Sequence, residues 1–287
     1  MPTRPDPLTI AGRTFVWGTR TYIMGAINLT PDSFSGDGLD GNVDAALRRA
    51  AAMVEHGADI LDIGGESTRP GFTPVDPIDQ ITRVVPTIRS IVKALDVPVS
   101  VDTTHPIVAR AALDVGATII NDTTGLLGDP GIAAAAAAAG AAVVAMHNQR
   151  RRPHNPHNDV VRDTCDGWAA ALRAADATGL PRRRVIVDPG FGFGWSHAQS
   201  LEILRRLTEL CAIGQPILVG PSRKSTIGAV LGLPVDQRLE GTAAAVTLAI
   251  ANGAHLVRVH DVQAMSRVAR LADAVVRGWT PPDDPRG

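Results

Sequence analysis

The sequence predicts a single-domain (β/α)8 barrel, the TIM-barrel architecture, and three observations lead to this prediction. The first is an alternation of short apolar runs with longer helical patterns rich in alanine and leucine, repeated eight times. Strands that alternate with helices pair in parallel through right-handed crossovers. The second is the length, because 287 residues suit one barrel of this kind. The third is that no linker, charge block or composition shift divides the chain.

The eight expected strands are short, apolar and bounded by polar turns, as buried parallel strands are. They are expected at 22–27, 60–63, 97–101, 118–120, 143–145, 185–187, 216–219 and 256–259. The helical patterns that follow them lie near 43–56, 79–94, 106–115, 130–139, 159–178, 198–211, 236–252 and 262–277. The alanine run at 133–139 favours a helix because alanine has the highest helix propensity.

The chain outside these repeats is short. Residues 1–20 carry prolines at positions 2, 5 and 7 and are expected to form an irregular lead-in. The barrel is expected to occupy 21–279, and residues 280–287 to form a C-terminal tail.

Bulk composition excludes several classes of protein. A net charge of −1 argues against a nucleic-acid-binding or membrane-binding surface. No apolar run has membrane-spanning length, and the N-terminus lacks the apolar core of a signal peptide. Cys165 and Cys211 fit no metal-ligand spacing, which predicts a reducing, cytoplasmic location. A P-loop is absent and G-F-G-F-G at 190–194 is not a dinucleotide motif, so nucleotide hydrolysis, zinc and NAD chemistry are not expected.

The turn after the seventh expected strand is the densest cluster of hydrogen-bond donors. The apolar run at 216–219 leads, through a Gly-Pro pair, into Ser222, Arg223 and Lys224. Of the 28 lysine and arginine residues only Lys93 and Lys224 are lysines, so this chain uses arginine where a plain positive charge suffices. A lysine beside an arginine therefore indicates a site that uses both a compact ammonium and a planar guanidinium.

Polar side chains follow nearly every expected strand, and in a barrel these strand ends share one rim. In chain order they are Asn28, Asp62, Asp102, Asn121, Asp122, His147, Asp188, Ser222, Arg223, Lys224, Arg258 and His260, with Met146 beside His147. On the last strand the period of two places Leu256, Arg258 and His260 on one face. Arg258 and His260 are therefore expected to point together into the barrel mouth.

The rim divides by charge. Barrels often bind phosphate on the loops after strands seven and eight, where this chain has its basic rim residues. On the other strands Asp102, Asn121 and Asp188 supply carboxylates and an amide, which can read the donor and acceptor edge of a flat heterocycle. Asn28 adds a neutral oxygen that suits Mg²⁺, a cation that takes few protein ligands when phosphates are present. The sequence thus predicts a mouth for a polar heterocycle that carries a phosphate or diphosphate.

Eight motifs resemble those of the dihydropteroate synthases and occur in that family's order from about residue 12 onward. They are I-N-L-T-P-D-S-F-S (27–35), D-I-G-G-E-S-T-R-P-G (62–71), S-V-D-T (100–103), I-N-D (120–122), M-H (146–147), D-P-G-F-G-F-G (188–194), S-R-K (222–224) and R-V-H-D (258–261). The resemblance implies a transferase of folate biosynthesis that joins p-aminobenzoate to a dihydropterin diphosphate. It also implies a (β/α)8 barrel, a Mg²⁺ cofactor, a homodimer and competition by sulfonamides.

The resemblance assigns roles to positions of this chain. It places Asp62, Asp102, Asn121, Met146, Asp188 and Lys224 around the pterin, with Asp102, Asp188 and Lys224 catalytic. It gives Asn28, Arg69, Arg258 and His260 to the diphosphate, with Asn28 also on Mg²⁺. It gives Phe34, Thr68, Pro70 and Ser225 to p-aminobenzoate, beneath loops 30–38 and 64–73. The implied path is dissociative, with the carboxylates stabilising a cation on the pterin methylene.

The chain departs from the family pattern chiefly at Trp195, where a lysine is usual. Two interpretations of Trp195 are open: it packs over the rim, or it lowers activity. The second supports an alternative function, a pterin-binding homologue without synthase turnover. The first loop also reads S-G-D-G at 35–38 where S-D-G-G is more usual.

Three further interpretations compete with the synthase. A pterin-dependent methyltransferase shares this barrel, but T-R-P-G at 68–71 and S-R-K at 222–224 imply a diphosphate to hold. A Schiff-base lyase would use Lys224 and needs a desolvated amine. The segment after His147 holds three arginines and two more histidines, and its spacing favours a loop at the rim over a metal or RNA site.

Overall fold

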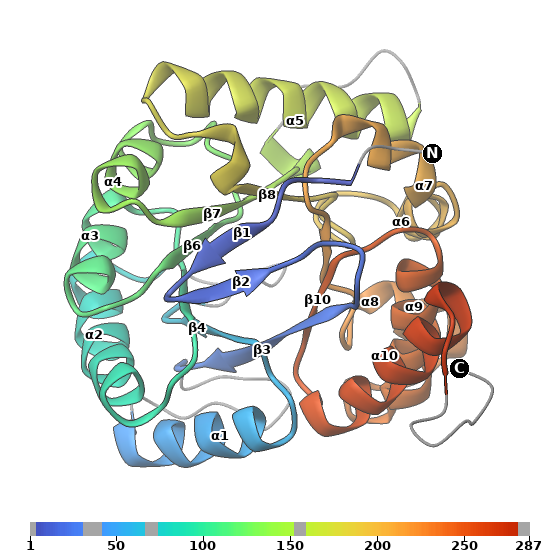
Figure 1. Cartoon of the computed structure of the whole chain (residues 1–287), viewed down its shortest axis with the longest axis horizontal. Coiled ribbons are helices and arrows are strands. Elements are labelled where there is room, and N and C mark those ends of the chain that lie inside the picture. Colours follow the sequence, from blue (N-terminus) through green and yellow to red (C-terminus); the bar gives the residue numbers. More distant parts are fainter. Residues whose placement is uncertain (1–3, 31–41, 67–73, 152–158, 281–287) are drawn as a thin grey trace.

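The computed structural model describes residues 4–30, 42–66, 74–151 and 159–280. Within them the chain forms a parallel barrel surrounded by helices (Figure 1). The barrel strands are β3 (Tyr22–Asn28), β4 (Ile60–Gly64), β5 (Val99–Asp102), β6 (Ile119–Asp122), β7 (Ala142–Met146), β8 (Val185–Asp188), β9 (Leu218–Val219) and β10 (Leu256–Val259). Their order is β8-β7-β6-β5-β4-β3-β10-β9, and a parallel bridge between Val187 and Ile217 joins β8 to the segment before β9. The predicted fold class is confirmed.

The helices occupy the outside of the barrel, as right-handed crossovers require. They are α1 (Val43–Glu55), α2 (Pro77–Ala94), α3 (Pro106–Asp114), α4 (Gly131–Ala139), α5 (Val160–Ala177), α6 (His197–Arg205), α7 (Leu207–Leu210), α8 (Ser225–Leu231), α9 (Leu239–Ala251) and α10 (Val262–Arg277). Short 3-10 turns lie at η1 (Gln149–Arg151), η2 (Arg182–Arg184), η3 (Cys211–Ile213) and η4 (Val235–Gln237).

Two helical features differ from the sequence prediction. The helix expected at 198–211 is divided at Arg206, whose φ of −105° and ψ of 14° leave the α-helical region. Helix α8 was not expected, because seven residues with a central glycine are too few to show a helical period. It follows Lys224 directly and therefore fixes the direction in which the S-R-K turn leaves the barrel.

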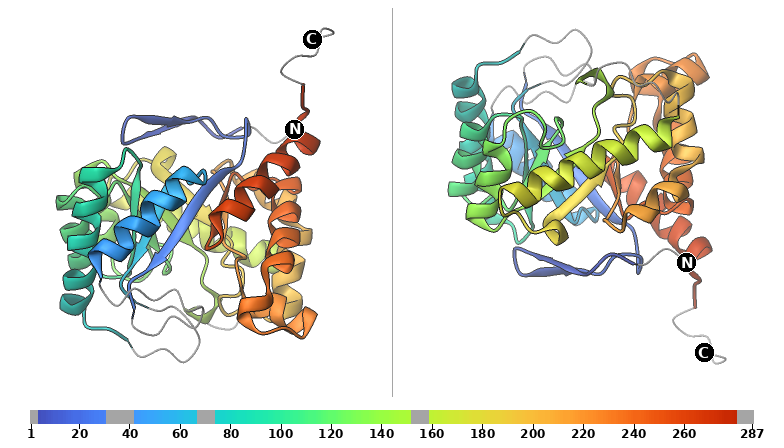
Figure 2. Two further views of the ribbon diagram at one scale, coloured as in Figure 1. Left: turned by 90° about the horizontal axis from the view of Figure 1, so that it is seen from below. Right: turned by 90° about the horizontal axis from the view of Figure 1, so that it is seen from above.

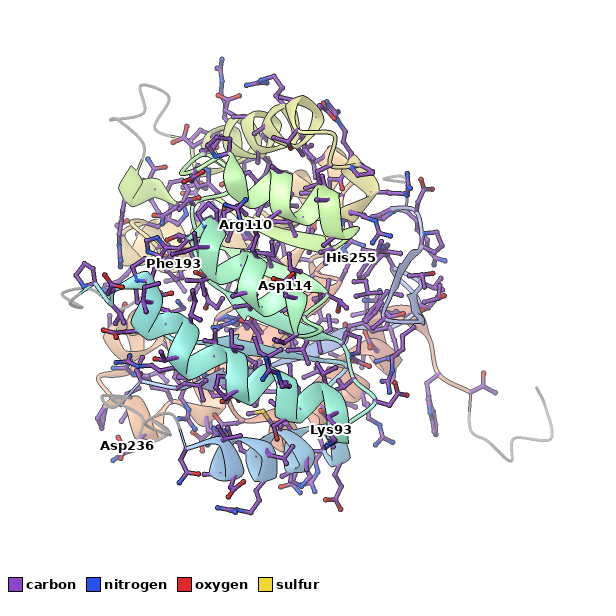
Figure 3. All side chains as sticks on the ribbon, turned by 90° about the vertical axis from the view of Figure 1, so that its left-hand side faces the viewer. Lys93, Arg110, Asp114, Phe193, Asp236 and His255 are labelled. Carbon is purple, nitrogen blue, oxygen red and sulfur yellow. The ribbon has the colours of Figure 1, made fainter. Side chains whose placement is uncertain are left out.

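The lead-in is more ordered than its prolines suggested. β1 (Leu8–Ile10) and β2 (Arg13–Phe15) form an antiparallel hairpin whose turn residues Ala11 and Gly12 both have positive φ, the twist that two-residue hairpins favour. The hairpin lies across one end of the barrel, and β3 runs away from it (Figure 2). His255 lies at this end, 6.1 Å in ring-centroid distance from Trp17, and Figure 3 shows Phe193 at the opposite end. The hairpin covers the end of the barrel at which the strands begin. The opposite end, where the strands finish, is therefore the end available for a site.

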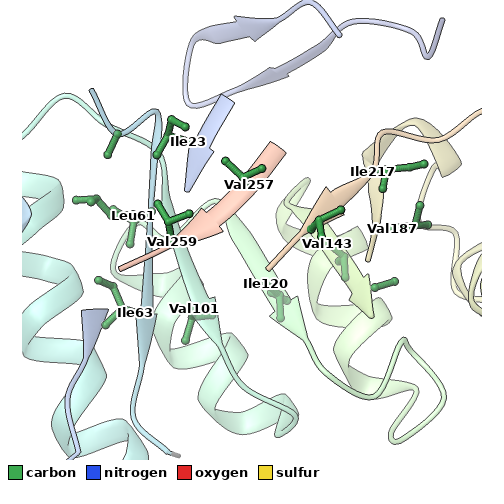
Figure 4. Close-up of a cluster of buried hydrophobic side chains, with 14 of the residues drawn as sticks. Ile23, Leu61, Ile63, Val101, Ile120, Val143, Val187, Ile217, Val257 and Val259 are labelled. Atoms are coloured by element: carbon green, nitrogen blue, oxygen red, sulfur yellow. The ribbon is translucent and has the colours of Figure 1, made fainter. Parts of the chain in front are cut away.

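The core has two layers that follow the period of two. One layer fills the barrel interior and includes Met24, Ile60 and Leu256, together with residues of the hairpin. The other lies between strands and helices and includes Leu61, Val257 and Val259 (Figure 4). Leu256 therefore faces inward and Val257 and Val259 outward, as the sequence predicted.

No helix in the described ranges combines the length and the apolar character needed to cross a bilayer. Residues 281–287, nearly all of the predicted tail, lie outside the described residues.

Candidate active site

The parallel barrel brings the predicted pterin residues to one end. Asp102 at the end of β5 is in register with Asn121 on β6, and Met146 at the end of β7 is in register with Asp188 on β8. Strand-end positions that are distant in sequence thus become lateral neighbours. Met146 is 3% exposed and Asp188 is 8% exposed, so both lie within the mouth rather than on its outer edge.

A buried polar network occupies the centre of this end. The fully buried Asp62 accepts hydrogen bonds at Oδ2 from Asn121 Nδ2 at 2.9 Å and from Arg258 Nε at 2.6 Å. The same guanidinium donates from Nη2 to Asp102 Oδ2 at 3.0 Å. Asp62 Oδ1 is buried and has no hydrogen-bond partner among the described residues. An unsatisfied buried acceptor is unfavourable in isolation, so this oxygen suits an N–H donor supplied by a ligand.

Arg258 was predicted to hold diphosphate, and the structure gives it two carboxylate partners instead. The assignment to diphosphate stays a prediction, because a planar guanidinium has five N–H donors and these contacts use two of its nitrogens. Arg258 would therefore couple the charge of Asp62 and Asp102, which are predicted to bind the pterin, to the charge at the predicted diphosphate site.

Two carboxyl groups and one amine have pKa values near neutral pH. Burial raises the pKa of Asp102 to about 7, against the attraction of Arg258 and with the repulsion of Asp62 added. Burial likewise raises the pKa of Asp188 to about 6, opposed by the Gly190 N–H, which donates to its Oδ1 at 2.7 Å. Desolvation, followed by repulsion from Arg258, lowers the pKa of Lys224 to about 7. Such clustering of perturbed groups is typical of functional sites.

Phe193 is a site residue that the sequence analysis missed. Its ring lies 3.9 Å from Lys224 Nζ, and the Arg150 guanidinium lies 5.6 Å from the same ring centroid. An ammonium over an aromatic face is held by the ring quadrupole. The sequence feature that could have indicated Phe193 is the G-F-G-F-G run after Asp188. Its glycines allow the backbone to pass close to neighbouring segments, so that the phenylalanine side chains can contact them.

Trp195 packs inside the rim. Its indole is 6% exposed, stacks on His147 with ring centroids 5.1 Å apart and planes 19° apart, and donates from Nε1 to the Pro189 carbonyl at 3.0 Å. Val160 and Ile203 complete its surroundings. The packing interpretation of Trp195 is confirmed, and its effect on activity remains a prediction.

The loops after β7 and β8 are joined by backbone as well as by this stack. His147 N donates to Asp188 O at 2.8 Å and Gln149 N to Phe193 O at 3.1 Å. Gly190 has a φ of +70°, and a Cβ there would lie 1.9 Å from the His147 carbonyl oxygen. Only glycine fits at 190, and the contact fixes the backbone that carries Asp188.

The S-R-K turn contributes less positive charge to the mouth than the sequence suggested. Arg223 donates from Nε and Nη2 to the two oxygens of Asp261 at 2.9 and 2.6 Å, so part of its charge is offset at the side of the site. Ser222 Oγ lies 2.9 Å from His260 Nδ1 and accepts from His260 N at 3.2 Å. Ser225, predicted at the p-aminobenzoate pocket, is exposed as the first residue of α8.

Several predicted residues lie outside the described part of the chain. They are Phe34, Thr68, Arg69 and Pro70, together with most of loops 30–38 and 64–73. The p-aminobenzoate pocket is therefore described at Ser225 alone, and the diphosphate site at Asn28, Arg258 and His260.

Asn28 is half-buried at the end of β3, beside Gly64. A Cβ built on Gly64 would lie 3.6 Å from both Asn28 Oδ1 and Asp102 Cβ, so the amide oxygen faces Asp102 across a residue without a side chain. Among the described residues no group of three or more His, Cys, Asp or Glu side chains could hold a metal. The Asn28 amide oxygen, with Asp102 facing it, fits a Mg²⁺ that obtains most of its ligands from substrate phosphates and water.

Comparison with known proteins identifies the family. Residues 24–260 match a family model described as "Pterin binding enzyme". The dihydropteroate synthase of Clostridium beijerinckii is 41% identical over 271 residues, covering 94% of this chain and 100% of the relative, and that of Bacillus subtilis is 42% identical, covering 90% and 89%. A Yersinia pestis dihydropteroate synthase solved with a sulfonamide superimposes with a TM-score of 0.89 at 36% identity, covering 96% of this chain and 100% of that one. A Xanthomonas albilineans dihydropteroate synthase with 4-aminobenzoic acid gives 0.86 at 42% identity, covering 95% and 98%. The chain belongs to the pterin-binding enzyme family, as one of the dihydropteroate synthases.

Proposed function

We propose that the protein condenses 6-hydroxymethyl-7,8-dihydropterin diphosphate with p-aminobenzoate, giving 7,8-dihydropteroate and diphosphate. The observation that carries the proposal is the buried network of Asp62, Asn121, Arg258 and Asp102, which leaves one carboxylate oxygen of Asp62 without a partner among the described residues. A pterin ring edge presents N–H donors beside acceptors, the complement of carboxylates next to an amide. Solved relatives with pteroic acid, 7,8-dihydropteroate and 4-aminobenzoic acid support the same pair of substrates.

The pterin would lie between the β5–β6 side of the mouth and Lys224. Asp102, Asn121 and Asp188 would bind the polar ring edge, with Asp62 behind them and Met146 as an apolar wall. Lys224 is held over Phe193 at the same end of the barrel, where its ammonium could donate to a ring acceptor. The low exposure of Asp62, Asn121 and Asp188 supports a strong electrostatic contribution, because interactions between charges strengthen away from water.

The reaction breaks the C–O bond between the pterin methylene and the diphosphate, and forms a C–N bond to the aniline nitrogen, which then loses a proton. As the C–O bond breaks, positive charge develops on the pterin, and ionised Asp102 and Asp188 would stabilise it. Arg258 and His260, with Arg69 from the loop after β4, would bind the departing diphosphate. Asn28 would hold Mg²⁺ together with that diphosphate, and the bound ion would offset part of its charge.

The test is dihydropteroate formation by the purified protein supplied with both substrates and Mg²⁺. We expect turnover that sulfonamides inhibit in competition with p-aminobenzoate. Turnover would also show that an indole at 195 is compatible with activity. Pterin binding without any product would instead support the pterin-binding homologue, the second candidate.

We also propose a homodimer, because α9 and α10 expose an apolar surface. Helix α9 carries one charged residue, Glu240, and its other exposed positions are Leu239, Ala244, Thr247, Leu248 and Ala251, of which only Thr247 is polar. Leu248 on α9 is 55% exposed, and Leu271 and Val275 on the neighbouring α10 are 70% and 78% exposed. Large apolar side chains exposed on neighbouring helices are typical of interaction sites, and a twofold pair of identical chains is the commonest way to bury them.

Glutamate at both Leu271 and Val275 is expected to convert the dimer to a monomer, because pairing would bury four charges. Sedimentation velocity at micromolar concentration is the measurement. The matched control is Ile107→Glu on α3, which is 46% exposed and lies on the other side of the barrel (Figure 1). A wild-type monomer, or a double variant that remains dimeric, would rule out this interface.

The proposal places the protein in the cytoplasm. Its two cysteines, Cys165 and Cys211, are unpaired and half-buried, as expected where thiols remain reduced.

A further inference from the structure

The backbone of the S-R-K turn is in an unusual conformation that the rest of the chain must maintain. Arg223 has a φ of +57°, in the left-handed region that residues with a side chain rarely adopt. Such a conformation persists only where the surrounding structure holds it, and it is most common at functional sites. The residue that follows is Lys224, so the direction of the lysine side chain depends on what holds this turn.

Arg238, on the connection between η4 and α9, contacts the turn directly. Its Nη1 donates to the Arg223 carbonyl at 3.0 Å and, at 3.4 Å, to the Lys224 carbonyl. Its Nε donates to the Leu233 carbonyl at 3.1 Å. One guanidinium therefore joins both peptide units that flank Lys224 to the loop after α8. A planar fork with several donors can make such contacts, and a single ammonium on a flexible stem cannot reproduce them.

Gly228 provides the space for this contact. A Cβ at position 228 would lie 2.2 Å from Arg238 Nη2 and 2.4 Å from Arg238 Cζ. The guanidinium thus lies directly on the backbone of α8, the helix that begins after Lys224. A glycine inside a seven-residue helix weakens the helix, so the close approach of Arg238 gives a physical reason for its presence.

Two further contacts hold Arg223 from other sides. The hydroxyl of Thr242, fully buried on α9, accepts from Arg223 N at 3.1 Å. Asp261 binds the Arg223 side chain. The Lys224 carbonyl also accepts from the backbone N–H groups of Ile227 at 3.0 Å and Gly228 at 3.4 Å in the first turn of α8. Arg238 adds the side-chain contact that joins the Arg223 carbonyl to the loop after α8.

We propose that Arg238 is a positioning residue for the synthase reaction: by holding the carbonyls of Arg223 and Lys224, it keeps the Lys224 ammonium over Phe193 and directed at the pterin site. This inference rests on the proposed function for its kinetic consequence, and its structural part can be tested without turnover. Arg238 would touch neither substrate. It would act through the turn, whose displacement by about 1 Å can lower a rate by ~10²-fold.

The first test uses Arg238→Gln and takes advantage of the two lysines of this chain. With ¹³Cε-labelled lysine the NMR spectrum holds one signal for Lys224 and one for the exposed Lys93, which serves as the internal reference. In wild type we expect the Lys224 signal to titrate with a pKa near 7, because desolvation and the repulsion of Arg258 and Arg150 outweigh the attraction of Asp188 and Asp102. In Arg238→Gln we expect this pKa to rise toward that of Lys93, because a displaced lysine regains water.

The kinetic test compares kcat and KM for the dihydropterin diphosphate. Arg238→Gln is expected to lower kcat/KM by roughly 10- to 100-fold, mainly in kcat, because Lys224 would no longer be aligned at the reacting ring. The matched control is Arg205→Gln, which removes an exposed arginine of α6 and should leave both readouts unchanged. Arg238→Lys should resemble the glutamine variant, since charge alone does not hold two carbonyls.

The outcomes separate positioning from general stability. A lower melting temperature with unchanged Lys224 pKa and unchanged kcat/KM would overturn the proposal. If Arg238→Gln does not fold, Gly228→Ala is measured instead, because its Cβ displaces the guanidinium and preserves the charge; unchanged readouts there would equally overturn it. If the wild type shows no turnover, the proposed function fails, and the lysine titration still decides the role of Arg238.

Discussion

Replacing Arg258 with methionine is expected to abolish measurable synthase activity and to destabilise the fold. Arg258 is the cation between Asp62 and Asp102, and its Nε lies 2.6 Å from the fully buried Asp62 carboxylate. Removing one partner from a buried ion pair leaves an uncompensated charge and lowers the free energy of unfolding by about 3–5 kcal/mol. Arg258 binds the carboxylates proposed to bind the pterin and is also proposed to bind the diphosphate. Its loss should therefore lower kcat/KM by ~10³-fold or more.

The measurement is urea denaturation of wild type and Arg258→Met at pH 5.5 and pH 8. Without the guanidinium the folded-state pKa of Asp102, already raised to about 7, should rise further. A folded-state pKa above the unfolded value means that the folded protein binds more protons, so stability is lost as pH rises through that window. The destabilisation should therefore be larger at pH 8 than at pH 5.5.

A double variant provides the control. Arg258→Met combined with Asp62→Asn removes the charge that the single variant leaves unpaired, so it should recover part of the stability and none of the activity. Equal destabilisation at both pH values, with no recovery in the double variant, would show that the network does not contribute as the distances indicate.

Replacing Lys224 with methionine is expected to lower kcat/KM by ~10²- to 10³-fold and to remove the alkaline limb of its pH profile. In wild type the profile should rise as Asp188 and Asp102 ionise, with pKa values of about 6 and 7. It should fall as Lys224 loses its proton, because desolvation lowers that pKa to about 7. The pH profile of wild-type kcat/KM should therefore be a narrow bell with its maximum near neutrality.

The control is Lys93→Met, which removes the chain's other lysine at an exposed position on α2 and should leave the profile unchanged. Stability gives an independent check of the same pKa. The folded-state pKa of Lys224 lies below the unfolded value, so above pH 7 the unfolded chain binds more protons than the folded chain. The contribution of this group to the free energy of unfolding of wild type should therefore increase as pH rises from 7 toward 10.5. Persistence of the alkaline limb in Lys224→Met would assign that limb to another group.

The sequence by itself predicts the eight strand–helix repeats and the polar residue that ends nearly every strand. Both are local signals: periodicity reports which face of an element is buried, and in a parallel barrel all strand ends meet at one rim. For that reason Asp62, Asp102, Asn121, Asp188 and Arg258 could be assigned to one mouth before any contact between them was known. The residues of loops 30–38 and 64–73, such as Arg69, remain assigned by sequence alone.

The tertiary structure decided which of these residues bind one another. Asp62 and Arg258 are separated by 196 residues and Arg223 and Asp261 by 38, and no local pattern indicates that either pair forms. The stacking of Trp195 on His147 depends on loops from two neighbouring repeats that lie side by side. The Arg238 contact with the turn before α8 depends on how the chain returns from α8 to that turn. The sequence determined what reaches the mouth, because strand ends are defined locally; only the folded chain decided how each charge is held there, because partners are chosen by proximity in space.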